Sequence, residues 1–348
     1  MKTSDFDYDL PQDRIAQYPV LERDHARLMI LNRRTRHIEH RIFRDIVEYL
    51  DPHDGLVLNE TKVFPARLEG IKEDTGARIE VLLLRRMENN LWEAMVRPGR
   101  RVPVGTSLAF GEGRLKGQVV DKTEEGHRRI AFEGPEETDA VLMEIGQIPL
   151  PPYIRRNAMA EDYEWYQTVY AKTFGAAAAP TAGLHFTPGL MEQIREMGIE
   201  IIPVLLHIGP GTFRPVTAED PRRHGMDAEY YEVSETAAEK INHTRRRGGR
   251  VVAVGTTSVR VLETACEAPS VKGQAKIVPS AGWTCTFIYP PYPFRIVDRL
   301  LTNFHLPRST LLMLVSAFAG RKFLLEAYQE ALTKDYRFYS YGDAMLIL

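Results

Sequence analysis

Cysteine is almost absent from this sequence. Among its 348 residues only Cys266 and Cys285 occur, in different segments and without a CxxC pair or a cluster with histidine. This scarcity argues against a cysteine-based zinc site and against the disulfide framework of a small secreted protein. We therefore expect a protein of a reducing compartment, and the sequence offers no evident set of metal ligands.

The sequence also lacks a secretory signal and a membrane span. Its polar start carries Asp5, Asp7 and Asp9 in place of the basic residues and apolar stretch of a signal peptide. The longest apolar stretch, residues 311–320, has about half the length that a bilayer requires and predicts a buried helix. We expect a cytoplasmic protein with no membrane contact.

An excess of positive charge is missing as well. The chain has 45 Lys and Arg against 47 Asp and Glu, a net charge of −2, which excludes the basic surface of a nonspecific nucleic-acid coat protein. A local basic face stays possible, because arginine clusters on one face would contact phosphates. These clusters comprise Arg33, Arg34 and Arg36; Arg97, Arg100 and Arg101; Arg128 and Arg129; Arg155 and Arg156; Arg222 and Arg223; and residues 245–247.

The length and the hydrophobic pattern predict two domains, since the chain is longer than one core usually serves. Residues 1–65 and 149–348 alternate helical and extended segments, which is typical of an α/β domain. Residues 66–148 contain short extended runs separated by glycine and charge clusters, and predict an inserted β-barrel. The proline-rich segment 148–154 predicts an extended linker where the barrel ends.

The loop 175–186 (GAAAAPTAGLHF) combines small residues, free backbone amides and one imidazole in front of an expected helix. Such a loop lets a ligand approach the backbone closely, so Thr181, Gly183 and His185 are candidate site residues. A tight turn in which His185 fills the core is an equally good explanation.

A second loop, residues 206–215 (LHIGPGTFRP), follows an apolar strand, and ligands in open α/β sheets gather beyond the carboxyl ends of strands. His207 and Arg214 would project there. Its two glycines do not form a dinucleotide fingerprint, so a structural turn is the alternative.

A third segment, residues 251–263 (VVAVGTTSVRVLE), predicts a strand, a glycine and a helix start. Thr256, Thr257 and Ser258 would present amides, hydroxyls and the positive end of the helix dipole to an anion, with Arg260 one turn further. Helix capping alone would explain the same residues.

A fourth segment, residues 301–311 (LTNFHLPRSTL), places Asn303, His305, Arg308 and Ser309 between a strand and an apolar helix. So many polar groups at one junction are difficult to explain by packing, which favours a functional site.

The segment 336–345 (YRFYSYGDAM) gathers aromatic residues, Tyr341 among them, around Asp343. Aromatic rings can stack on a nucleobase, but buried rings more often belong to a core. Taken alone, this segment favours packing.

Together these motifs resemble a known enzyme family. The longest are PTAGLHF (180–186), VGTTSVRVLE (254–263), TNFHLPRSTLLMLVSAFAG (302–320) and YRFYSYGDAMLI (336–347). Shorter ones are DFDYDLP (5–11), IAQYP (15–19), PARL (65–68) and IPLPPYI (148–154). Over nearly its whole length the chain resembles the S-adenosylmethionine:tRNA ribosyltransferase-isomerase family of queuosine biosynthesis.

The resemblance implies a reaction in which the ribosyl part of S-adenosylmethionine joins the aminomethyl group of a 7-deazaguanine at the tRNA wobble position. Adenine and methionine leave, and epoxyqueuosine remains. It also implies an α/β barrel-like larger domain with a smaller all-β barrel inserted. S-adenosylmethionine would be the co-substrate without a metal and tRNA the partner, and we expect a monomer because no protein partner is implied.

Three positions depart from the pattern of the family. Residues 59–62 read Asn-Glu-Thr-Lys where Asn-Asn-Thr-Arg is common, Met226-Asp227 stands where Met-His is usual, and Pro291 replaces a usual glycine. If that histidine is a catalytic base in relatives, Asp227 replaces it or the role lies elsewhere. Asp227 is therefore a further candidate.

A base near the sulfonium could start the reaction, because the sulfonium acidifies its neighbouring carbons. A neutral histidine suits removal of a C5′ proton near pH 7, and His185, His207 and His305 are candidates. The polar neighbours of His305 make it the preferred one. Residues 256–258 with Arg260 are the candidate anchor for the methionine carboxylate or a tRNA phosphate.

Two other functions fit parts of the sequence. A methyltransferase also uses S-adenosylmethionine, but no GxGxxG motif follows an early strand. A tRNA-binding scaffold would bind the nucleic acid without releasing adenine, and would leave the polar clusters unexplained.

Overall fold

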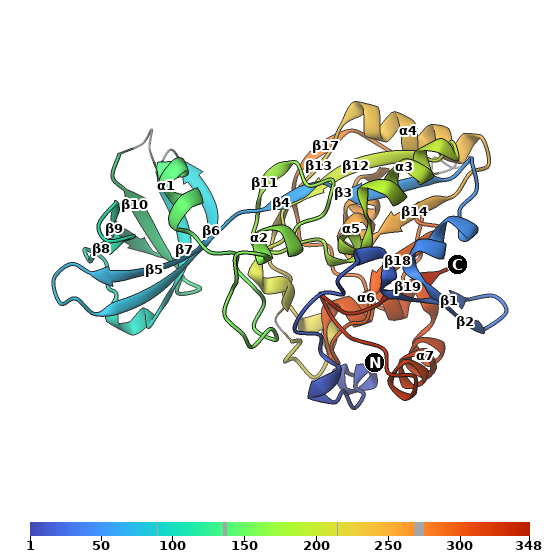
Figure 1. Cartoon of the computed structure of the whole chain (residues 1–348), viewed down its shortest axis with the longest axis horizontal. Coiled ribbons are helices and arrows are strands. Elements are labelled where there is room, and N and C mark those ends of the chain that lie inside the picture. Colours follow the sequence, from blue (N-terminus) through green and yellow to red (C-terminus); the bar gives the residue numbers. More distant parts are fainter. Residues whose placement is uncertain (89, 135–137, 214, 268–274) are drawn as a thin grey trace.

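The computed structural model describes residues 1–88, 90–134, 138–213, 215–267 and 275–348. Figure 1 shows a small barrel at one end of the molecule and a larger part built around a sheet, with β4 (Thr61–Val63) and β11 (Thr173–Ala176) between them. These two strands pair in parallel. None of the helices in the described ranges is long and apolar enough to cross a bilayer.

A nine-stranded mixed sheet forms the centre of the larger part. In spatial order its strands are β17 (Ser280–Thr284), β13 (Glu229–Val233), β12 (Glu200–Leu206), β3 (Gly55–Asn59), β14 (Val251–Val254), β18 (Arg299–Asn303), β19 (Ala344–Ile347), β1 (Arg27–Asn32) and β2 (His37–Ile42). Strands β12, β3, β14 and β18 run parallel, and every residue of β3 and β14 is buried. Burial on both faces is typical of central parallel strands.

The sheet separates two hydrophobic cores, because successive side chains of a strand point to opposite faces. In β1, Leu28 and Ile30 belong to one core, and Met29 and Leu31 belong to the other.

Helices cover both faces of this sheet. Helix α3 (Pro188–Glu196) contributes to the core of Leu28, while α4 (Glu235–Arg246), α5 (Gly255–Thr264), α6 (Thr310–Ala319) and α7 (Arg321–Thr333) contribute to the core of Met29. Helix α6 confirms the buried helix expected at residues 311–320.

Hydroxyl caps begin three of these helices. The side-chain oxygens of Thr187, Ser234 and Ser309 accept hydrogen bonds of 3.2, 3.1 and 3.1 Å from backbone amides at the starts of α3, α4 and α6. Each cap satisfies an amide that the helix itself leaves without a partner.

Six antiparallel strands close the smaller part into a barrel, in the order β10-β7-β6-β5-β8-β9. They are β5 (Arg67–Lys72), β6 (Arg78–Glu88), β7 (Leu91–Arg97), β8 (Ser107–Phe110), β9 (Leu115–Lys122) and β10 (Arg128–Phe132). Helix α1 (Thr138–Ile145) packs Leu142 into the barrel core. The predicted α/β fold with a smaller all-β barrel inserted is thereby confirmed, and the strands of the larger part form the nine-stranded sheet described above rather than a closed barrel.

The remaining regular elements are short. They are α2 (Asp162–Trp165), the pair β15 (Cys266–Glu267) and β16 (Lys276–Ile277), and the 3-10 helices η1 (Thr3–Phe6), η2 (Gln12–Arg14), η3 (Arg23–His25), η4 (Phe43–Tyr49), η5 (Gly99–Arg101), η6 (Thr181–His185), η7 (Pro210–Phe213) and η8 (Pro221–Arg223).

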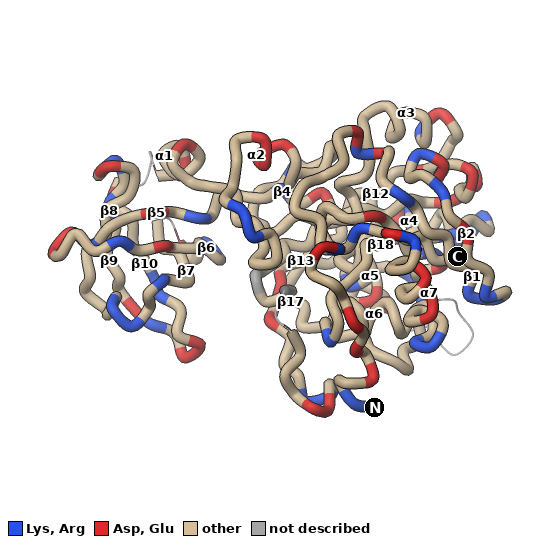
Figure 2. The backbone as a smooth tube through the Cα atoms, turned by 60° about the horizontal axis from the view of Figure 1, so that its bottom comes forward, with Lys and Arg blue, Asp and Glu red and all other residues tan. Residues whose placement is uncertain are grey.

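Charged residues of both signs are interspersed over the two parts in the view of Figure 2. Several arginines of the predicted basic clusters form ion pairs with acidic side chains: Arg36 with Glu326, Arg129 with Asp121, and Arg222 with Asp220. These pairs reduce the positive charge that the clusters present to a partner.

Candidate functional site

A cleft of about 1370 Å³ lies between the barrel and the large sheet. Side chains of β6, β7 and the turn between β9 and β10 form its barrel wall, and the ends of β12, β13 and β17 form its other wall. Residues 174–177, in and after β11, line the cleft between these walls. Single small-molecule pockets usually measure about 300–1,000 Å³, so this cleft has room for more than one small ligand.

His207 follows the last residue of β12 and lines this cleft. Its Nδ1 lies 2.9 Å from Oγ1 of Thr61 in β4, a hydrogen bond that fixes the orientation of the ring. Burial lowers the pKa of His207 below its ordinary value. The imidazole is therefore neutral near pH 7, the state in which it can accept a proton.

Gly175 lies against the other edge of the same imidazole. A Cβ at this position would be 2.6 Å from both Nε2 and Cε1 of His207. The φ angle of Gly175 is +149°, a backbone conformation that residues with a side chain rarely adopt. The glycine thus gives His207 the space that it occupies beside β11.

A row of rings lies along this wall, formed by His207 directly after β12 and by Tyr230 and Trp283 of the neighbouring strands β13 and β17. The centroids of His207 and Tyr230 are 5.9 Å apart in a stacked arrangement, and those of Tyr230 and Trp283 are 5.8 Å apart at 70°. Tyr230 and Trp283 are register partners of β13 and β17, and the amide of His207 donates to the carbonyl of Tyr230. Side chains opposite each other on adjacent strands pack in this way.

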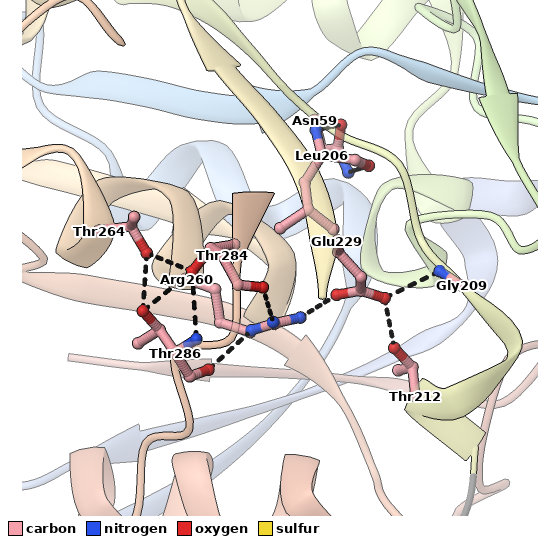
Figure 3. Close-up of polar contacts among 9 residues, drawn as sticks. All are labelled: Asn59, Leu206, Gly209, Thr212, Glu229, Arg260, Thr264, Thr284 and Thr286. Atoms are coloured by element: carbon pink, nitrogen blue, oxygen red, sulfur yellow. Dashed lines mark hydrogen bonds and ion pairs between the residues drawn. The ribbon is translucent and has the colours of Figure 1, made fainter. Parts of the chain in front are cut away.

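Arg260 forms a buried ion pair with Glu229 (Figure 3). Its Nε donates to the carbonyl oxygen of Thr286 at 3.1 Å. Glu229 also accepts hydrogen bonds from the amide of Gly209 and the hydroxyl of Thr212, both at 2.8 Å. The pair connects α5 to the loop after β12, and the guanidinium predicted to bind an anion contacts groups of the protein itself.

Residues 256–258, expected to anchor an anion, are all buried at the start of α5. The hydroxyl of Ser258 donates to the carbonyl oxygen of Val254 at 2.7 Å. Oγ1 of Thr257 is buried without a hydrogen-bond partner. None of the three residues lines the cleft.

Thr181, His185 and Asn303 meet where η6 contacts the end of β18. The hydroxyl of Thr181 donates to Oδ1 of Asn303 at 2.9 Å, and Nδ2 of Asn303 lies 3.2 Å from Nε2 of His185. Burial, followed by the positive charges of Arg23 and Arg337, lowers the pKa of His185 to about 3.

The cluster lies beside a small cavity of about 90 Å³, lined by His185 and Tyr341 among others. Gly183 in the same turn packs closely against Tyr170, since a Cβ there would lie 1.9 Å from the Tyr170 hydroxyl. The structure thus gathers residues predicted from three separate motifs.

His305 is enclosed by the protein. Its Nε2 lies 2.8 Å from the Thr302 hydroxyl, its amide donates to the Tyr328 hydroxyl at 2.9 Å, and its carbonyl accepts from Tyr8. Burial lowers its pKa to about 3. It lines neither the cleft nor the cavity beside His185.

Three further candidates bind protein groups. Tyr341 donates to Asp162 at 2.9 Å, and Arg308 pairs with Asp7 at the surface. Asp343 accepts two 2.8 Å hydrogen bonds, from the amides of Arg27 and Arg337, and burial raises its pKa.

Asp227 is exposed and lines the cleft with His207. Arg214, the other residue predicted on this loop, lies outside the described residues.

The sequence predictions omitted several residues around His207, namely Thr61, Gly175, Glu229, Tyr230 and Trp283, and the barrel side chains of the opposite wall. Gly175 belonged to a loop already singled out for its small residues, and Thr61 to a segment noted for its departures. The others carried no local signal, because a single polar or aromatic residue in a strand is common.

One group of side chains in the described parts of the chain could hold a metal ion. It consists of Glu22, Asp24 and His25, with ligand atoms within 4.8 Å of one another. Glu22 and His25 are exposed, and none of the three residues lines the cleft.

Comparisons with known proteins cover almost the whole chain. The sequence pattern of the family described as "Queuosine biosynthesis protein" matches residues 3–347. The S-adenosylmethionine:tRNA ribosyltransferase-isomerases of Pelotomaculum thermopropionicum and Moorella thermoacetica are similar at 56% and 57% identity, with 100% of each chain covered. The crystal structure of S-adenosylmethionine tRNA ribosyltransferase from Thermotoga maritima is 43% identical, with a TM-score of 0.56 over 99% of this chain and 100% of that one.

Proposed function

The chain belongs to the family of queuosine biosynthesis proteins, and from this membership we propose that it is an S-adenosylmethionine:tRNA ribosyltransferase-isomerase. It transfers and isomerises the ribosyl part of S-adenosylmethionine onto 7-aminomethyl-7-deazaguanine at the tRNA wobble position. Adenine and methionine are released, and epoxyqueuosine remains in the tRNA.

The cleft between barrel and sheet is the proposed reaction site. The reaction requires an adenosyl sulfonium and an extruded nucleobase in one place, and the cleft of about 1370 Å³ exceeds what one small ligand needs. A base must leave its stack before an enzyme can modify it, so the site must hold a flipped-out base beside the co-substrate. This cleft with His207 in its wall is the observation that carries the proposal.

His207 is the proposed base that removes the C5′ proton of S-adenosylmethionine. It alone of His185, His207 and His305 lines the cleft, its lowered pKa favours the neutral ring, and Thr61 orients it. The electron pair left on carbon would start the rearrangement that expels adenine.

Asp227 is proposed to face the sulfonium. The residue is exposed at the same cleft, and a negative charge near a sulfonium stabilises the bound cation. This role would use the aspartate at the position where relatives usually have histidine.

Several of the other predicted residues are proposed to support the site from outside the cleft. Thr181, His185 and Asn303 hold η6 against β18. Arg260 pairs with Glu229, and Glu229 holds the loop after His207 by accepting a hydrogen bond from Gly209. The buried start of α5 would support the same wall.

We further propose a cytoplasmic monomer, with the inserted domain at residues 66–148. Its tRNA substrate favours the cytoplasm, and the acid–base steps above need no metal.

The decisive test supplies the protein with S-adenosylmethionine and a tRNA carrying 7-aminomethyl-7-deazaguanine, and identifies the products by mass spectrometry. Free adenine and methionine in equal amounts are expected, with a matching mass increase of the tRNA. Formation of S-adenosylhomocysteine would instead indicate a methyltransferase. Binding of tRNA with no adenine release would indicate a scaffold.

A further inference from the structure

The row of rings in the cleft runs from the candidate base to an open edge of the sheet. His207 is partly buried, Tyr230 lies next to it, and Trp283 ends the row on the edge strand β17. Trp283 is 52% exposed, although tryptophan is among the most apolar and usually most buried side chains. The exposed indole lines the cleft, where a ligand could cover it.

The indole of Trp283 is held in place without being buried. Tyr230 supports it from the neighbouring strand at 70°, an edge-to-face contact that fixes the ring plane. Tyr230 is in turn supported by His207. A ring that is fixed and half exposed loses little conformational freedom when a planar group stacks on it.

A planar cation from the barrel already lies over this indole. The guanidinium carbon of Arg85 in β6 is 5.1 Å from the centroid of the Trp283 ring. Arg85 also pairs with Glu93 at 2.9 Å, and the other carboxylate oxygen of Glu93 lies 2.8 Å from Nδ1 of His127. Arginine planes and aromatic rings are the groups on which proteins stack unpaired bases.

Arg85 is held over Trp283 only weakly. Its side chain is 44% exposed, and partly exposed ion pairs such as that with Glu93, whose side chain is 15% exposed, contribute only modestly to stability. The guanidinium can therefore move aside, or cover the second face of an inserted ring.

We propose that Trp283 is a stacking platform for an unpaired nucleobase of the tRNA substrate, with Arg85 as its movable cover. This inference rests on the proposed function and adds a specificity-determining contact to it. The position of Trp283 favours a base of the tRNA, rather than the adenine of S-adenosylmethionine, as the ring that stacks on it. The co-substrate must place its C5′ carbon at His207, whereas the nucleic acid must enter from the exposed end of the row.

The test compares Trp283→Ala and Trp283→Phe with the wild-type protein in steady-state kinetics. Loss of one base–aromatic stack corresponds to roughly 5- to 150-fold in affinity. We expect Trp283→Ala to raise KM for tRNA within that range and to leave KM for S-adenosylmethionine unchanged. Trp283→Phe should retain most of the tRNA affinity, because phenylalanine also stacks.

Tyr18→Ala is the matched control. Tyr18 is 49% exposed and carries the guanidinium of Arg156 at 4.5 Å from its ring centroid, but it does not line the cleft. Both KM values should stay at the wild-type level. An equal rise of the tRNA KM in this variant would overturn the proposal.

Two other results would also overturn it. One is an unchanged tRNA KM in Trp283→Ala. The other is a rise confined to the S-adenosylmethionine KM, which would mean that the Trp283 indole stacks on the adenine of the co-substrate.

Fluorescence separates this inference from the proposed function and does not depend on turnover. The chain has three tryptophans, so tRNA should quench the wild-type emission more than that of Trp283→Phe. Identical quenching would contradict stacking on Trp283. If the wild type binds tRNA with this quenching but releases no adenine, the proposed reaction fails while the platform stands.

Discussion

At the scale of single residues, His207 combines the three properties that a base in this cleft requires. It lines the cleft, a hydrogen bond between its Nδ1 and Thr61 sets its orientation, and burial lowers its pKa. Because this hydrogen bond occupies Nδ1, we assign proton removal to Nε2, the nitrogen beside Gly175.

Replacing His207 by glutamine should slow adenine release by about 10²–10⁴-fold, the usual contribution of a general base. Single-turnover release of adenine measures the effect, and S-adenosylmethionine affinity serves as the control because glutamine preserves most of the volume. A variant that releases adenine at the wild-type rate would exclude this role.

The pH dependence of the wild-type enzyme provides a further check on His207. A base acts in its deprotonated form, and the pKa of His207 is lowered, so the rate should fall only below the ordinary histidine value of about 6.5. A rate that falls already between pH 8 and 7 would contradict this assignment.

Gly175→Ala should reduce adenine release although it removes no functional group. The added methyl would lie 2.6 Å from the imidazole of His207, on a backbone with φ of +149°. We expect a lower melting temperature or a displaced His207, and in either case a lower rate. Gly189→Ala is the control, since a Cβ there meets nothing within 4 Å, and normal activity of both variants would show that the space is not needed.

At the scale of elements, the wall of the cleft depends on a contact between a loop and a helix. Glu229 of β13 accepts hydrogen bonds from residues 209 and 212 and pairs with Arg260 of α5. Both charged side chains are buried, so each depends on the other for its polar contacts.

Breaking this pair by Glu229→Gln should therefore destabilise the protein by about 3–5 kcal/mol, the range for leaving one buried charge unpaired. Urea unfolding measures the change. Glu192→Gln, which removes the exposed pair with Arg195, should cost about 1 kcal/mol or less. Similar losses in the two variants would mean that burial of the Glu229 pair has no energetic consequence.

Elements were the level at which sequence patterns predicted most. The apolar run at 311–320 predicted a buried helix and α6 is one, while the change of pattern near residue 66 predicted the inserted barrel. These patterns succeed because hydrophobic periodicity is a local property of the chain. The helix start predicted within residues 251–263 is confirmed for the same reason, since α5 begins at Gly255.

At the scale of the whole molecule, buried histidines make stability depend on pH. Burial lowers the pKa of both His185 and His305 to about 3, whereas an unfolded histidine titrates near 6.5. Between these values the unfolded chain binds more protons than the folded one, so the free energy of unfolding decreases as pH falls. The stabilisation is complete above pH 6.5 and is lost toward pH 3.

Unfolding by urea between pH 7 and pH 4 should reveal this loss, with a slope of up to about 1.4 kcal/mol per pH unit for each histidine. In His305→Gln the free energy of unfolding should change less steeply with pH below 6.5 than in the wild type, whatever the absolute stability. His53→Gln, at an exposed histidine, is the control and should retain the wild-type slope. Equal slopes in all three proteins would contradict the pKa of His305.

The cleft itself belongs to the whole molecule, because its walls come from segments far apart in the chain. His207 and Thr61 are 146 positions apart, and the Arg85 of the barrel meets Trp283 of the sheet edge. The polar neighbours that favoured His305 as the base in the sequence, Asn303, Arg308 and Ser309, contact other groups in the structure. His305 is enclosed instead by Thr302, Tyr328 and Tyr8. A high local density of polar residues in the sequence does not distinguish a functional site from a core whose polar groups are hydrogen-bonded to one another.

The sequence by itself determined the fold class, the helix starts, the buried helix α6 and the family motifs, since each depends on residues near one another in the chain. Only the tertiary structure decided which motifs share a cavity: His207 and Asp227 line the cleft, while His185, His305 and Arg260 contact protein groups. The physical reason is that side-chain burial, and with it each pKa and each hydrogen-bond partner, follows from long-range packing that no local pattern encodes.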